Sequence, residues 1–94
     1  MTMSPKDRQA WLEAWVRLHK RADVLDDAFV RAYIKATDVP WRETMWGAPK
    51  CPTLGRDLAA LAAQGRLNRY RVGMSNWQPG FPKWVWSYEI PGSI

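Results

Sequence analysis

The hydrophobic positions near the N-terminus recur every three or four residues, which is the spacing of one face of a helix. Ser4 is a suitable N-cap and Pro5 suits the first helical position, so a helix is predicted to begin there and to end near Lys20 or Arg21. Its apolar stripe, which we expect to pack on the core, is formed by Trp11, Leu12, Trp15, Val16 and Leu18.

A second amphipathic stretch follows residues 23–25, which are predicted to be extended. Asp26 or Asp27 is expected to cap this second helix, which should continue to about Thr37. Pro40 ends it, because the residue before a proline is pushed out of helical geometry. The buried face of the helix is predicted to consist of Phe29, Val30, Tyr33 and Ile34.

Residues 38–51 have no sustained hydrophobic period, so they are interpreted as a long connection that could contain a short helical turn. A connection of this length without anchors is uncommon in a small domain. We therefore expect the large apolar side chains of Trp41, Met45 and Trp46 to hold it against the body of the protein.

The third predicted helix has the clearest pattern. Leu54, Leu58 and Leu61 recur at positions i, i+4 and i+7 and should face the core, and Gly65 should end the helix at its C′ position. The opposite side is predicted to carry Thr53, Arg56, Asp57, Ala60 and Gln64.

Two segments with alternating apolar residues follow, at residues 67–74 and 83–90, and both are predicted to be strands. Tyr70 and Val72 alternate on the first strand, whereas Arg69 and Arg71 share its other face. The residues between the strands are rich in turn formers, so the pattern predicts a β-hairpin.

The predicted order is helix, short strand, helix, helix and hairpin. Residues 52–69, a leucine-patterned helix that ends at a glycine and leads into a basic strand, resemble the recognition helix and wing entry of the winged helix-turn-helix superfamily. The resemblance implies an α+β fold with three helices and a C-terminal two-stranded wing, and it implies DNA binding.

Length and composition favour one domain over residues 1–94, because 94 residues are too few to close two hydrophobic cores. A single cysteine, Cys51, cannot form an intramolecular disulfide, which favours a reducing compartment. The sequence has no leader-like N-terminus and no run long enough to span a membrane. We therefore expect a cytoplasmic protein with no membrane partner.

The net charge of +5 is unevenly distributed along the chain. Residues 1–47 contain eight basic and seven acidic side chains, whereas residues 48–94 contain six basic and two acidic ones. A positive excess confined to one segment is typical of a face that binds a polyanion.

Double-stranded DNA is therefore the expected partner, with residues 52–64 in the major groove. Arg56 could form a paired hydrogen bond with guanine, and Thr53 or Lys50 could hold a phosphate near the start of the helix. The full set of expected DNA contacts is Lys50, Thr53, Arg56, Gln64, Arg66, Arg69, Arg71 and Lys83.

Direct reading of bases should be sparse, because alanines fill the middle of the helix and Asp57 is expected to place a negative charge on the DNA-facing side. A small transcriptional regulator, or an accessory factor of a phage or other mobile element, is the function we expect. A palindromic target would require a homodimer, for which the first helix with Trp11 and Trp15 is the expected surface.

Two alternatives remain open from the sequence. The same fold could bind a protein through exposed aromatic residues, with Trp77 and Phe81 as the leading candidates and Trp41 or Trp46 as further ones. The aromatic residues could instead stack on the bases of single-stranded nucleic acid.

Enzymatic activity is not expected. One histidine, one cysteine and no glycine-rich phosphate loop do not form a nucleophile-and-base pair or a metal site. The sequence accordingly predicts no catalytic residue, no metal and no cofactor.

Overall fold

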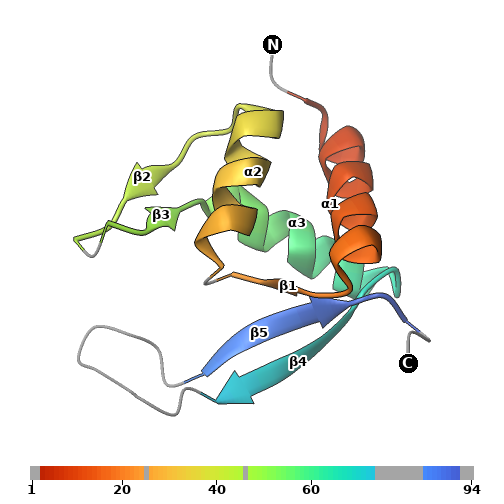
Figure 1. The fold of residues 1–94 in the computed structure, drawn as a ribbon. Helices are drawn as coiled ribbons and strands as arrows, with labels where there is room; N and C mark the ends of the chain where they lie inside the picture. The colour runs from red at the N-terminus through yellow and green to blue at the C-terminus, as the bar shows by residue number, and fades with distance from the viewer. Residues whose placement is uncertain (1–2, 25, 46, 74–83, 92–94) are drawn as a thin grey trace.

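The computed structural model describes residues 3–24, 26–45, 47–73 and 84–91, and has an α+β fold (Figure 1). Its helices are α1 (Pro5–His19), α2 (Asp27–Thr37) and α3 (Pro52–Ala63). Its short strands are β1 (Ala22–Asp23), β2 (Arg42–Glu43), β3 (Pro49–Lys50), β4 (Asn68–Gly73) and β5 (Trp84–Glu89). None of the helices in these residues is long and apolar enough to cross a membrane.

A three-stranded antiparallel sheet lies beneath the helices, in the order β1-β5-β4 (Figure 1). The pairing of β4 with β5 confirms that the two C-terminal strands are antiparallel partners. The short extended piece predicted at residues 23–25 corresponds to strand β1, which begins one residue earlier and ends at Asp23, and it pairs with β5 through Ala22 and Tyr88. This pairing ties the connection between α1 and α2 to the C-terminal part of the chain.

Local hydrogen bonds fix the helix ends where the sequence placed them. The Ser4 hydroxyl accepts a hydrogen bond from the Asp7 backbone N–H, and the Asp26 carboxylate accepts bonds from the start of α2. Gly65 adopts a positive φ of 73°, and the Arg66 N–H closes back onto the Leu61 carbonyl. This Schellman arrangement turns the chain sharply from α3 into β4.

Residues 38–51, which we expected to be a long connection that could contain a short helical turn, instead contain β2 and β3, which pair as a two-stranded ribbon. Gly47, with a φ of 78°, allows the tight turn between the two strands. Met45 is 88% exposed, so its expected anchoring role is wrong. Trp41 is 44% exposed, and its ring contacts α2, because the Arg31 guanidinium lies over it at 6.0 Å from the ring centre. Trp46 lies outside the described residues. The buried side chain of Val39 belongs to the core instead.

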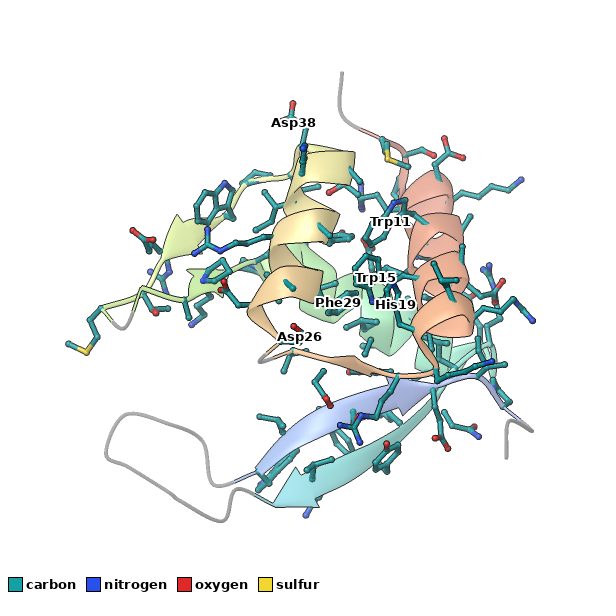
Figure 2. The ribbon with its side chains drawn as sticks, in the orientation of Figure 1. Trp11, Trp15, His19, Asp26, Phe29 and Asp38 are labelled. Carbon is teal, nitrogen blue, oxygen red and sulfur yellow. The ribbon has the colours of Figure 1, made fainter. Side chains whose placement is uncertain are left out.

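The core lies between the helices and the sheet. Trp11 and Trp15 on α1 turn toward α2, where their rings pack against Tyr33 and Phe29 (Figure 2). His19 stacks on Trp15 at a ring distance of 4.0 Å, which agrees with a structural role for this histidine. The rings of the two tryptophans are half-buried against the core, and a dimer through the first helix stays a prediction.

A buried carboxylate joins all three helices. Asp57 on α3 is only 4% exposed, and it accepts a hydrogen bond from the Arg8 guanidinium of α1 at 2.8 Å and another from the Tyr33 hydroxyl of α2. The expectation that Asp57 faces outward is therefore wrong. Successive helical residues are about 100° apart, so position 57 borders the leucine stripe of 54, 58 and 61, from which Arg8 and Tyr33 are within reach.

Replacement of this carboxylate should strongly destabilise the fold. Asp57→Ala leaves the Arg8 guanidinium and the Tyr33 hydroxyl without their shared partner, so we expect a loss of about 3 kcal/mol in the free energy of unfolding, measured by urea denaturation. The control is Asp7→Asn, which removes an exposed carboxylate and should cost under about 1 kcal/mol. Equal losses for the two variants would contradict the bridging role of Asp57.

The pKa of Tyr33 is raised well above its ordinary value, first because the hydroxyl is buried and second because it donates to the Asp57 carboxylate. A raised folded-state pKa stabilises the fold fully below about pH 10, the ordinary tyrosine value, and this contribution is lost as the pH rises toward the folded-state pKa. The pKa of Tyr88 is also raised by burial. Ionisation of Tyr33 and of Tyr88 therefore both lower the free energy of unfolding at alkaline pH.

Tyr33→Phe should cost about 1 kcal/mol at pH 8, because it removes one hydrogen bond to Asp57. Above pH 10 the unfolding free energy of the wild type should fall with pH, and in Tyr33→Phe this fall should be less steep. The difference in slope should be at most about 1.4 kcal/mol per pH unit, the value for one proton. Urea denaturation at several pH values measures both effects, with Tyr88→Phe reporting the other tyrosine. An unchanged alkaline slope in Tyr33→Phe would disprove the assignment.

Candidate nucleic-acid interface

The solvent-facing side of helix α3 carries mostly small and weakly polar residues. Pro52, Gly55, Arg56 and Ala63 are exposed, and a Cβ atom built on Gly55 meets nothing within 4 Å. Thr53 is half-buried, and its hydroxyl accepts a hydrogen bond from the Arg56 guanidinium at 3.4 Å. Of the residues expected on the outward side, Arg56 lies there fully, whereas Asp57 has turned inward. Because Asp57 is buried and paired with Arg8, its negative charge does not lie on the outward side, where we expected it to repel phosphates.

An open hollow of about 430 Å³ lies where α3 meets the first residues of β4. Its lining combines small helix side chains with polar ones from the strand, namely Ala59, Ala62, Ala63, Leu67, Asn68 and Arg69. Arg56 lies three and seven residues before Ala59 and Ala63, and therefore on the same side of the helix. The hollow thus places Arg69 of β4 beside the face of α3 that carries Arg56.

Arg69 and Arg71 stack on the tryptophans of the neighbouring strand. The antiparallel register pairs Arg69 with Tyr88 and Arg71 with Trp86, which confirms that the two arginines share one face of β4. The Arg69 guanidinium lies 4.5 Å from the Trp86 ring centre, and that of Arg71 lies 4.5 Å from the Trp84 ring centre. Such contacts hold a guanidinium in place by its face, while its N–H groups can donate from the edge, and the Arg69 guanidinium already interacts with the Tyr88 hydroxyl in this way.

The tryptophans beneath these arginines differ in burial. Tyr88 is buried in the core and Trp86 is half-buried against it, as expected for a packed sheet face. Trp84, however, is 40% exposed and lies beyond the edge of the core. Its ring therefore supports Arg71 at the surface, in addition to any contribution to packing.

Arg66 and Gln64 are held by α1. The Arg66 guanidinium donates to both carboxylate oxygens of Glu13, at 3.0 and 3.3 Å, and this hydrogen bonding raises the pKa of Arg66 further above its ordinary value. Gln64 donates to Gln9 and accepts from Arg66. Both side chains thus fasten the end of α3 to α1, so they are less available for the contacts that we expected of them from the sequence.

Three cationic side chains near α3 have no acidic partner within 4.0 Å in the described part of the chain: Arg56, Arg69 and Arg71. Lys50, at the end of β3, is exposed and also has no such partner. It lies directly opposite Arg42 of β2, a residue that sequence analysis did not select. The glycine turn between the strands was the available signal for this ribbon.

The remaining expected contacts fall on residues that are not described, namely Lys83, Trp77 and Phe81.

A second open hollow, of about 380 Å³, lies along α1 and is lined by Ala10, Glu13, Ala14, Arg17 and Leu18. One helix alone supplies its lining and Glu13 is already bonded to Arg66, so it does not form a basic site.

No group of three or more His, Cys, Asp or Glu side chains within residues 3–24, 26–45, 47–73 and 84–91 could hold a metal ion. Cys51 is half-buried, and its thiol lies 3.6 Å from the Pro40 carbonyl.

No family model, no curated protein and no solved structure matches this chain, so its function is inferred from the geometry of its own residues.

Proposed function

We propose that this chain binds double-stranded DNA as a winged helix-turn-helix domain, with α3 in the major groove and the β4–β5 pair as the wing along the backbone. The order of elements and the β1-β5-β4 sheet are compatible with this fold. The proposal is carried by the hollow shared by α3 and Arg69, because the exposed Arg56 lies on the side of α3 that lines this hollow. No acidic side chain neutralises either arginine within the described residues.

The smooth side of α3 suits a close approach to DNA. A B-DNA major groove about 12 Å wide admits a helix, and alanine and glycine on the facing side keep the helix axis close to the groove floor. Arg56 is the one long hydrogen-bonding side chain on this side between Pro52 and Ala63. A single paired contact to guanine supplies roughly 1–3 kcal/mol of discrimination between bases.

Most of the affinity would then come from phosphates. Arg69 and Arg71, held on Trp86 and Trp84, are placed to donate to the backbone with little loss of side-chain freedom. Binding of this kind discriminates weakly between sequences, because phosphate contacts carry no base information. It suits an accessory factor, in transcription or in a phage or other mobile element, better than a repressor that must find one site in a genome.

The proposal is tested by measuring the affinity for a labelled 20-base-pair duplex over a range of salt concentrations, by fluorescence anisotropy. We expect affinity to fall with salt, and the double variant Arg69→Gln/Arg71→Gln to reduce the slope of log K against log salt by roughly 1.8, or 0.9 for each lost phosphate contact. Arg56→Gln should weaken binding and reduce any difference in affinity between duplexes of different sequence.

The matched control is Lys6→Gln/Arg17→Gln, which removes the same charge from exposed positions on α1. It should leave the slope nearly unchanged. Absence of salt-dependent duplex binding, or equal effects of the two double variants, would overturn the proposal. A single-stranded oligonucleotide of the same length gives a further comparison, since tighter binding to it would favour a role in single-strand recognition.

A further inference from the structure

The ribbon β2–β3 carries two like charges directly opposite each other. Arg42 pairs with Lys50 in the antiparallel register, and both side chains are exposed. Residues directly opposite each other in such a pair have Cβ atoms roughly 5 Å apart, and like charges there are destabilising. No acidic side chain lies within 4.0 Å of either residue in the described structure, so the repulsion is not relieved within it.

The two cations point away from α2. Side chains alternate between the faces of a strand, and Glu43, the next residue after Arg42, faces α2, where its carboxylate lies 3.9 Å from the Arg31 guanidinium. Arg31 also binds Asp27 at 2.8 Å. Arg31 thus engages Asp27 and Glu43 on the side of the ribbon that faces α2. Arg42 and Lys50 occupy the other face.

The ribbon is held in a fixed position. Arg31 donates to the Gly47 carbonyl at 3.1 Å, and the Thr44 hydroxyl donates to the Ala48 carbonyl across the turn at 3.0 Å. At the base of the ribbon the Cys51 thiol contacts the Pro40 carbonyl. The anchored ribbon keeps the backbones of Arg42 and Lys50 opposite each other, so little backbone freedom is lost when an anion binds between the two side chains.

The ribbon also leads directly into α3. Lys50 precedes the first residue of α3 by two positions, so its Cα lies within about 13 Å of that of Arg56, from the lengths of extended and helical chain between them. At its other end α3 leads through Gly65 into β4, which carries Arg69 and Arg71. Strands that carry basic residues, β3 and β4, therefore adjoin the two ends of α3, a helix about 18 Å long (Figure 1).

We propose that Arg42 and Lys50 form a second phosphate clamp, through which the β2–β3 ribbon binds the DNA backbone at the N-terminal end of α3. This inference rests on the proposed function, since it assumes that α3 lies in the groove. The sugar-phosphate strands border that groove on both sides, so a helix within it has phosphates near each end. The β2–β3 ribbon contacts one border and the β4–β5 pair contacts the other.

The test is the same duplex titration with Arg42→Gln/Lys50→Gln, beside the wild type, Arg69→Gln/Arg71→Gln and the control Lys6→Gln/Arg17→Gln. The clamp predicts that removing Arg42 and Lys50 reduces the salt slope by roughly 1.8, as two phosphate contacts require. Thermal unfolding at low salt should show a melting temperature equal to or above that of the wild type, because a repulsion has been removed.

The outcomes separate the two proposals. One outcome is that the wild type shows salt-dependent binding, and the salt slope falls in Arg69→Gln/Arg71→Gln but not in Arg42→Gln/Lys50→Gln. The second clamp is then refuted and the DNA-binding function stands. If the wild type shows no salt-dependent binding, both proposals fail. A melting temperature that falls by several degrees in Arg42→Gln/Lys50→Gln would show that these cations serve the fold, and would also overturn the clamp.

Discussion

The rotation of α3 about its own axis depends on the Asp57 carboxylate. Arg8 of α1 and Tyr33 of α2 both donate to this carboxylate, so position 57 must face inward next to the leucine stripe. A helix rotated by one residue would bury a different side chain and leave the guanidinium and the hydroxyl unpaired, which costs more than any single contact within the helix. Since α3 is fixed in this way, Arg56 faces outward, beside the alanines that line the hollow with Arg69.

Ion pairs divide the arginines into two groups. Arg8 and Arg66 bind acids of a neighbouring helix and hold α1 against α3, so their charges are already neutralised within the fold. Arg56, Arg69 and Arg71 have no such acid in the described structure, and two of them rest on tryptophan rings. Net charge alone does not reveal this division. The positive excess of the C-terminal half becomes informative only once the paired cations are subtracted.

The sequence predicted the parts of the fold that depend on local interactions, and it failed where distant residues decide. The caps at Ser4 and Asp26 and the turn at Gly65 follow from short-range hydrogen bonds, and the leucine stripe of α3 follows from helical spacing. The inward turn of Asp57 depends on partners 49 and 24 residues away, which periodicity does not reveal. The β2–β3 ribbon was missed because its strands have two residues each and are anchored by Arg31 of α2.

We propose that one face, made by α3 and the basic strands at its two ends, contacts DNA. The most direct measurement is an NMR titration of the labelled protein with a short duplex, followed through the backbone amide signals. We expect the largest shifts on Gly55, Arg56, Ala63 and Arg69 and on the β2–β3 ribbon, while the exposed Ala10 and Ala14 of α1 stay unchanged. Shifts centred on α1, with α3 and β4 unaffected, would contradict it.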